Sequence, residues 1–181
     1  MPLEEIVLPV TEPETEWVRG RALQKMSPTR DHSRLQMEIG AALNRWAARG
    51  RGEVGTEWRF RITVPGEATR PLVPDLSFVA LDRLRGLSHE AIQAPAFAPT
   101  VAIEVLSPGD DPRDVADKVA VYLRGGTSLV IVVDSKTRTM MLHDAAGSKL
   151  LGTNDVLRHP VLPRFKLHLG ALFSGALDLP V

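Results

Sequence analysis

The 181-residue chain contains no cysteine, which rules out disulfide bonds, thiolate metal ligands and cysteine nucleophiles. No apolar stretch approaches the length of a membrane span, and no segment has the pattern of a signal peptide, so the expected compartment is the cytoplasm. The chain also lacks an excess of charge of either sign, with 22 Lys and Arg against 22 Asp and Glu. A formal net charge of zero excludes a global basic field of the kind that supports constitutive, tight DNA binding.

What is present is typical of a globular protein, with 44% hydrophobic and 24% charged residues. The length predicts a single domain over residues 1–181, in which residues 1–15 form an extended arm rich in Pro and Glu. Basic residues gather early in the chain, and they form either a local basic face or surface charges balanced by acids elsewhere. These residues are Arg19, Arg21, Lys25, Arg30, Arg34, Arg45, Arg49, Arg51, Arg59 and Arg61.

The first half of the chain predicts a hairpin, a helix and two strands. Residues 16–23 read as two short strands that turn at Gly20. Ser27 can cap the following helix, with Pro28 at the first helical position. Residues 53–64 and 72–80 read as strands. Residues 81–99 predict a short helix and a loop, which forms either a lid over the site or a plain surface connection.

The second half predicts a central strand at residues 100–106 and a helix from its cap Asp111 to Leu123. An apolar strand at 129–133 and a partner strand at 138–143 follow, and then a hairpin-like region and a helix near Leu169–Leu177. A helix, antiparallel strands and a strand–helix–strand unit in this order indicate a mixed α/β core.

The chemistry centres on Glu104, which stands alone in the apolar run Val101–Leu106. A carboxylate in such a buried strand is costly to ionise unless a cation, a metal or several donors meet it. Asp75 begins a second apolar run, and Lys118 lies on the helix that follows Glu104. If the two strands are neighbours, Asp75 and Glu104 can hold Mg²⁺ or Mn²⁺ through oxygen atoms. Lys118 would hold the attacking water or stabilise charge on a phosphate.

Each of these residues also has an ordinary structural interpretation. Asp75 follows Pro74 and could simply begin a strand, and Lys118 could pair on the helix surface with Asp114, four residues earlier. Glu104 is harder to explain in this way, because its neighbours on both sides are apolar. The three residues together are more specific for a metal-dependent hydrolase than any one of them alone.

Several motifs together resemble the putative restriction endonuclease (Uma-type) family of the PD-(D/E)XK nuclease superfamily, over nearly the whole chain. The motifs are Pro74-Asp75, Ile103–Pro108, Asp114–Lys118 with Tyr122 and Gly125, Glu16–Gly20 with Met26–Pro28 and His32, Leu129–Asp134, and Leu162–Leu167. The resemblance implies a restriction-endonuclease-like core, a mixed β-sheet flanked by α-helices. It also implies metal-dependent hydrolysis of phosphodiester bonds, most simply in DNA.

Carried over residue by residue, the resemblance makes Asp75 and Glu104 the metal ligands and Lys118 the basic catalytic residue. The chain departs from the superfamily pattern at Leu106, because the usual lysine lies two residues after the glutamate. Lys118 can replace it only if its side chain reaches back from the helix.

Three further residues have open roles beside this set. Tyr122 orients Lys118, contacts the substrate or simply packs in the core. Glu38 is either a further ligand or a solvated helix residue, and His32 is either structural or faces the substrate.

Two other classes of function stay open. The chain could be a non-catalytic nucleic-acid-binding or interaction module that keeps the fold, which the displaced lysine and the zero net charge favour. It could also hydrolyse another phosphate ester, which would require a closed pocket. A homodimer is expected for a nuclease that cuts both strands of a duplex, because two sites related by a twofold axis do this most simply.

Overall fold

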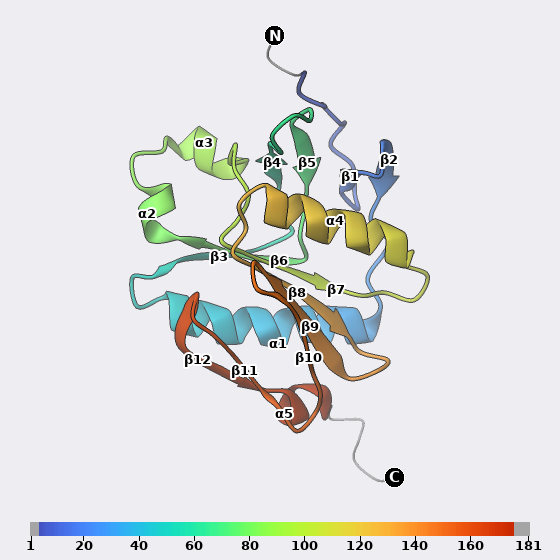
Figure 1. The fold of residues 1–181 in the computed structure, drawn as a ribbon, viewed down its shortest axis with the longest axis vertical. Helices are drawn as coiled ribbons and strands as arrows, with labels where there is room; N and C mark the ends of the chain where they lie inside the picture. The colour runs from blue at the N-terminus through green and yellow to red at the C-terminus, as the bar shows by residue number, and fades with distance from the viewer. Residues whose placement is uncertain (1–3, 176–181) are drawn as a thin grey trace.

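A six-stranded mixed sheet forms the centre of the computed structural model, which describes residues 4–175 (Figure 1). Its strands in spatial order are β10 (Gly147–Leu151), β9 (Thr139–Asp144), β8 (Leu129–Asp134), β7 (Val101–Val105), β6 (Leu76–Ala80) and β3 (Gly52–Thr56). Strands β7 and β8 are parallel, whereas every other neighbouring pair in this sheet is antiparallel. A parallel pair needs a crossover connection, and a helix between the two strands supplies it, as predicted.

One long helix covers each face of this sheet, α1 (Arg30–Ala47) on one side and α4 (Pro112–Arg124) on the other (Figure 1). Within the described residues there are three shorter helices, α2 (Leu81–Leu84), α3 (His89–Gln93) and α5 (Leu169–Phe173). As predicted, Asp111 caps α4, because its side chain accepts a hydrogen bond from the backbone N–H of Arg113 at 2.8 Å.

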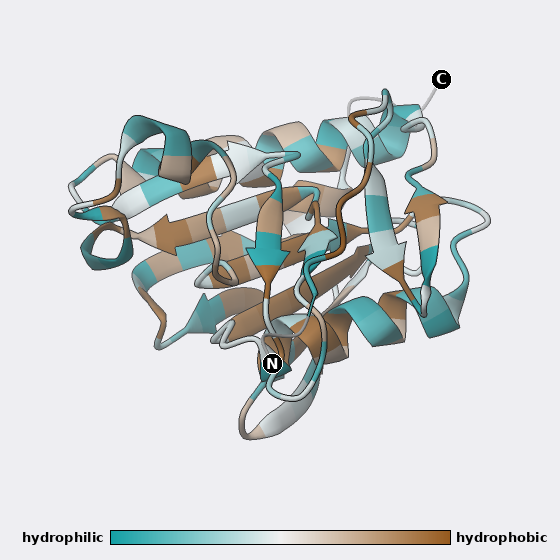
Figure 2. Ribbon diagram, turned by 90° about the horizontal axis from the view of Figure 1, so that it is seen from above, coloured by the Kyte–Doolittle hydropathy of each residue, from teal (hydrophilic) through white to brown (hydrophobic). Residues whose placement is uncertain are grey.

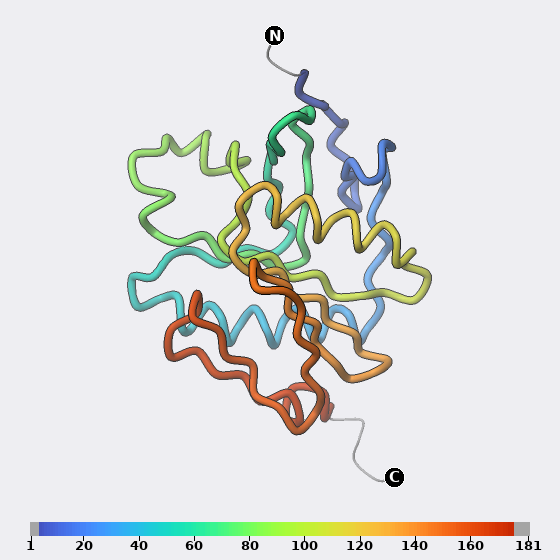
Figure 3. The backbone as a smooth tube through the Cα atoms, in the orientation of Figure 1, coloured from blue at the N-terminus to red at the C-terminus, as the bar shows by residue number. Residues whose placement is uncertain are grey.

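Three two-stranded sheets surround the central one. They are β1 (Thr15–Val18) with β2 (Arg21–Gln24), β4 (Phe60–Ile62) with β5 (Arg70–Leu72), and β11 (Val156–His159) with β12 (Leu162–His168). The tube in Figure 3 shows the first two pairs on the α4 side of the central sheet and the third pair beyond α1. The expected opening and closing hairpins are therefore both present.

The central sheet separates two hydrophobic clusters. The apolar residues of β7 are divided between the two clusters. The cluster that includes α1 contains Val101, Ile103 and Val105, and the cluster that includes α4 contains Ala102. Figure 2 shows the central strands as largely hydrophobic ribbons between helices with hydrophilic outer faces. Because side chains alternate along a strand, Glu104 shares the face of Ala102 and points toward α4.

Both strands predicted in the middle of the chain are broken. The stretch 53–64 divides into β3 and β4, and the stretch 72–80 divides into β5 and β6, so that each stretch contributes to two different sheets. The first break contains Glu57, which has a positive φ of 50°, a conformation that ends regular pairing. Asp75 lies in the second break, and its carbonyl accepts a hydrogen bond from the Glu57 backbone N–H at 3.3 Å.

Two helix ends differ from the prediction. The cap of α1 is Thr29 rather than Ser27, because the Thr29 hydroxyl accepts from the backbone N–H of His32 at 3.3 Å and the helix starts at Arg30. Helix α5 ends at Phe173, and the predicted end at Leu177 lies outside the described residues. In the part of the chain from residue 4 to residue 175, no helix is long and apolar enough to cross a membrane.

Candidate active site

The two predicted acidic residues lie on neighbouring strands. Strand β6 pairs with β7 in the register Leu76↔Ile103, and continuing this register by one residue sets Asp75 opposite Glu104. Asp75 is further fixed by its Oδ2 atom, which accepts a hydrogen bond from the backbone N–H of Val105 at 2.7 Å. The condition set by the sequence, that the two strands be neighbours, is therefore met.

Lys118 does reach back from α4 to Glu104. Its Nζ donates to Glu104 Oε2 at 2.7 Å, and the Tyr122 hydroxyl donates to Glu104 Oε1 at 2.9 Å. Lys118 and Tyr122 are four residues apart and therefore lie on one face of the helix. Only 6% of Glu104 and 7% of Lys118 is exposed, so this is a buried ion pair and not the helix-surface pair with Asp114. Asp114 instead binds the guanidinium groups of Arg19 and Arg21.

Glu16 is a member of this cluster that the sequence reasoning missed. Its Oε2 accepts from Lys118 Nζ at 2.9 Å, and its Oε1 accepts from the backbone N–H of Val73 at 2.7 Å. Glu16 lies on β1 two residues before the fully buried Val18, so both side chains are on the same face of the strand. That spacing was the available signal, since an acidic residue in phase with a buried valine is itself expected to be buried.

A second lysine, Lys25, lies at Asp75. Its Nζ donates to Asp75 Oδ1 and to Glu57 Oε2, both at 2.6 Å, and to the carbonyl oxygen of Val73 at 2.9 Å. His32 approaches the same Asp75 oxygen, with 3.5 Å between Nε2 and Oδ1. Neither Lys25 nor Glu57 was predicted as a site residue, and no local pattern in the sequence identifies them.

Three side chains are close enough to share a metal ion. One ligand atom from each of His32, Glu57 and Asp75 lies within 4.8 Å of the others. The His32 ring is oriented by its Nδ1, which lies 3.0 Å from the Ser107 hydroxyl, so Nε2 points to Asp75. Gln36 holds this group from α1, because its amide donates to Glu57 Oε1 and to the Asp75 carbonyl. The group contains the predicted ligand Asp75, whereas both Glu104 oxygens are bound by Lys118 and Tyr122.

Burial and close charges shift the pKa values of this cluster. Burial raises the pKa of Glu104 to about 8, with further contributions from Asp75 and Glu16, while Lys118 opposes the shift. For Asp75, burial is outweighed by attraction to Lys25 and Lys118, so its pKa is lowered. Burial alone would lower the pKa of Lys118, but Glu104 and Glu16 raise it above its ordinary value, and the group stays an ammonium.

All three predicted residues line one cavity of about 660 Å³. The cavity is bounded by β1–β2, the N-terminal half of α1, the end of β7 and the first half of α4, and it also contains Glu16, Lys25, His32 and Glu57. Glu38 is outside it and pairs with Arg34 at 2.7 Å, which agrees with the solvated interpretation. Residues 81–99 do not line it either, so they form a surface connection and not a lid.

Comparison with known proteins supports the same fold. Residues 4–170 match the model of the Uma2 family, described as putative restriction endonucleases. A solved structure, a putative nuclease belonging to DUF820 from Anabaena variabilis ATCC 29413, matches with a TM-score of 0.81. That match has 23% sequence identity and covers 92% of this chain and 93% of the other, so it concerns the fold alone. Among curated proteins, no match is found.

The expected architecture, a restriction-endonuclease-like mixed sheet flanked by helices, is confirmed by this likeness. The family model spans nearly all of the described residues. The chain therefore belongs to the Uma2 family of putative restriction endonucleases.

Proposed function

We propose that the protein is a nuclease that hydrolyses phosphodiester bonds in DNA and depends on Mg²⁺ or Mn²⁺. The observation that carries this proposal is the meeting of Asp75, Glu104 and Lys118 in one cavity, with the ammonium 2.7 Å from the Glu104 carboxylate. Two carboxylates on neighbouring strands and a fixed cation are the parts that metal-assisted attack on a phosphate requires.

The donor atoms around Asp75 suit a divalent metal ion. Carboxylate oxygens from Asp75 and Glu57 and an imidazole nitrogen from His32 fit Mn²⁺, and the oxygens fit Mg²⁺. Glu104 lines the same cavity and is the remaining candidate ligand. A bound metal would polarise a phosphoryl oxygen and lower the pKa of a bound water.

The chain's own residues position the charges. Lys118 is held between Glu16 and Glu104, at 2.9 and 2.7 Å, so its ammonium cannot rotate away from the cavity. In that position it stabilises negative charge that develops on a phosphate without first having to reorient. Tyr122 fixes the other oxygen of Glu104, and so keeps the carboxylate plane aligned with Lys118. Glu104, Lys118 and Asp75 are thus the proposed catalytic residues.

Incubation with plasmid DNA and with single- and double-stranded oligonucleotides, in Mg²⁺ or Mn²⁺, tests the proposal. We expect cleavage by the natural sequence, and a loss of roughly 100-fold or more in Glu104→Gln and in Lys118→Met, each with an intact fold by circular dichroism. Lys149→Met is the matched control, because Lys149 is exposed on β10 and should leave the rate unchanged. A simple aryl phosphate, tested as a substrate in the same assay, distinguishes a nuclease from a hydrolase of other phosphate esters.

Either of two results would contradict the proposal. One is the absence of cleavage on every DNA substrate with both metals, and the other is full activity in Glu104→Gln.

A non-catalytic nucleic-acid-binding module is the second candidate, and one observation favours it. Each carboxylate of the cluster already has an ammonium partner, Glu104 with Lys118 and Asp75 with Lys25. Such a module would bind DNA without cutting it, and Glu104→Gln would leave the affinity unchanged in fluorescence anisotropy.

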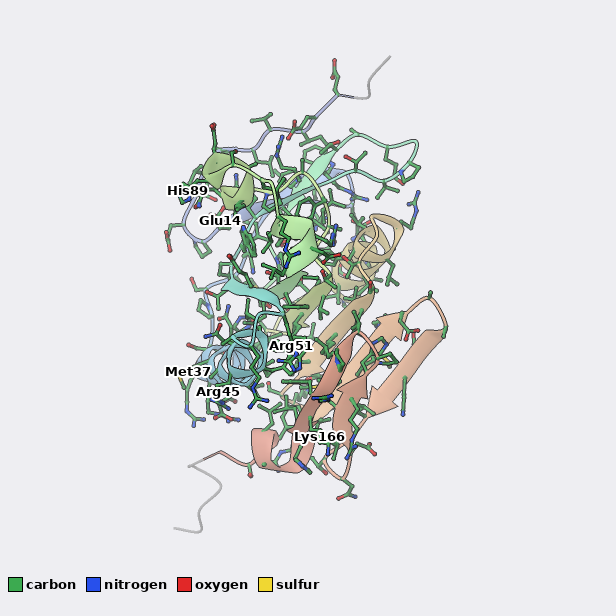
Figure 4. The ribbon with its side chains drawn as sticks, turned by 90° about the vertical axis from the view of Figure 1, so that its left-hand side faces the viewer. Glu14, Met37, Arg45, Arg51, His89 and Lys166 are labelled. Carbon is green, nitrogen blue, oxygen red and sulfur yellow. The ribbon has the colours of Figure 1, made fainter. Side chains whose placement is uncertain are left out.

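The basic residues do not favour this second candidate. Most of the early arginines form ion pairs with acids: Arg19, Arg21, Arg30, Arg34, Arg59 and Arg61. Arg45 and Arg51 lie near the end of α1, with Lys166 below them in Figure 4, and none of these three residues lines the cavity. The expected homodimer stays a prediction, which sedimentation with and without a DNA duplex would test.

A further inference from the structure

The Lys25 ammonium occupies the position of a bound cation beside Asp75. Its three donor hydrogens are matched by three oxygens, one each from Asp75 and Glu57 at 2.6 Å and the carbonyl of Val73 at 2.9 Å. The lysine side chain is 12% exposed, and that of Asp75 only 3%. A lysine head group in so complete a set of oxygen partners neutralises charge that would otherwise be buried without compensation.

The same two carboxylates belong to the group that could hold a metal ion. His32, Glu57 and Asp75 form that group, and Lys25 binds two of its three members. An ammonium and a divalent cation cannot both occupy the oxygens between Asp75 and Glu57, because they need the same lone pairs and repel one another.

We propose that Lys25 is a resident counter-ion of this site, which a divalent metal must displace, and that Lys25 thereby sets the metal affinity of the protein. The inference rests on the proposed metal-dependent function and adds a regulator of its metal site. In the absence of metal, Lys25 keeps Asp75 and Glu57 paired; when metal binds, the lysine leaves and the carboxylates change partner.

The position of Lys25 in the fold allows this exchange. It follows β2 on the connection to α1, and its neighbours Met26 to Thr29 are exposed, so the long side chain has open space to enter. The side chain of Lys118 has no such freedom, because it lies on α4 with its ammonium enclosed between Glu16 and Glu104. Lys25 is therefore the exchangeable cation of the cavity and Lys118 the fixed one.

Isothermal titration of Mn²⁺ into the natural protein and into Lys25→Met tests the proposal without reference to cleavage. We expect the variant to bind Mn²⁺ roughly tenfold more tightly or better, because a like charge a few ångströms from the ion has been removed. Lys166→Met, a change at an exposed lysine of β12, should bind as the natural protein does. The double variant Lys25→Met with Glu57→Gln should lose this gain in Mn²⁺ affinity, because the Glu57 carboxylate has been replaced by a neutral amide.

A thermal-shift measurement covers the case in which Lys25→Met folds poorly. Without metal, the variant should melt below the natural protein, since two carboxylates lose their cation, and Mn²⁺ should raise its melting temperature more than that of the natural protein. Lys25→Gln serves as a second variant that is uncharged but still donates hydrogen bonds.

Equal Mn²⁺ affinity in the natural protein and in both Lys25 variants would overturn the role of Lys25 and leave the nuclease proposal intact. If none of these proteins binds metal or cleaves DNA, the proposed function fails together with the inference. Weaker binding in Lys25→Met would show that the lysine supports the metal site, which also contradicts displacement.

Discussion

At the scale of single residues, Glu104 shows what a charge in the middle of a strand requires. Its carboxylate is buried, and it is tolerated because Lys118 and Tyr122 donate to its two oxygens from one face of α4. Burial nevertheless raises the pKa of Glu104 above its ordinary value, and the negative charges of Asp75 and Glu16 add to that shift. The site therefore holds charge at a cost to the stability of the fold.

The change Glu104→Gln measures that cost. The pKa of Glu104 is raised from 4.5 to about 8 in the folded protein, so between these values the unfolded chain loses its proton more readily than the folded one. The free energy of unfolding of the natural protein therefore falls as the pH rises from 4.5 to about 8. The glutamine is not ionisable, and the melting temperature of the variant minus that of the natural protein should increase from pH 5 to pH 8. Differential scanning fluorimetry in a metal chelator measures both melting temperatures. Glu53→Gln is the control, because Glu53 is an exposed glutamate. A difference that does not change with pH would contradict the raised pKa.

Tyr122→Phe removes one donor from Glu104 and leaves the ring in place. We expect a loss of about 1–3 kcal/mol in the free energy of unfolding, because a buried carboxylate oxygen loses the hydroxyl that donates to it. Urea denaturation at neutral pH provides the measurement. A variant as stable as the natural protein would mean that the hydroxyl makes no net contribution.

At the scale of elements, α1 connects the site to the core. Its buried stripe of Leu35, Ile39 and Leu43 packs on the sheet, while His32 and Gln36 at its start reach the cavity. The Thr29 cap fixes the first turn by accepting from the backbone N–H of His32. The start of the helix therefore sets the place of a candidate metal ligand.

Replacing the cap tests which residue starts α1. Thr29→Ala should cost about 1 kcal/mol of unfolding free energy, the usual value for a lost N-cap, whereas Ser27→Ala should cost nothing measurable. Chemical denaturation of both variants makes the comparison. A larger loss in Ser27→Ala would place the cap at Ser27, and equal losses would contradict Thr29 as the residue that caps the helix.

The elements that the sequence predicted well are those with strong local signals. The apolar runs of β7 and β8 and the Asp111-Pro112 start of α4 are encoded within a few residues, and their positions agree with the structure to within about two residues. The breaks at Glu57 and Asp75 were missed, because each depends on pairing with a different sheet. No pattern inside 53–64 or 72–80 encodes the partner strand.

The residues of the candidate site likewise divide into those that the sequence predicted and those that it did not. Asp75, Glu104 and Lys118 lie in or beside well-predicted elements, and their meeting follows from strand order and helix face. Glu16 and Lys25 come from the opening hairpin and its exit, far away in sequence, and only the three-dimensional packing brings them to the other charges.

At the scale of the whole molecule, both hydrophobic clusters are built on the two faces of one sheet. Strand β7 alone contributes residues to both clusters, so the packing of each cluster depends on the same strand. We therefore expect one cooperative unfolding transition, as a single domain would give, with tryptophan fluorescence and far-ultraviolet circular dichroism changing together. Two separate transitions would contradict a single domain.

The central claim is that metal-assisted cleavage depends on the buried carboxylate of Glu104. Its most direct test is the single-turnover cleavage of an end-labelled DNA oligonucleotide across a series of Mn²⁺ concentrations, by the natural protein and by Glu104→Gln. The account predicts a rate that rises and saturates with Mn²⁺ in the natural protein and is absent in the variant. Cleavage that persists in a metal chelator, or that survives unchanged in Glu104→Gln, would contradict it.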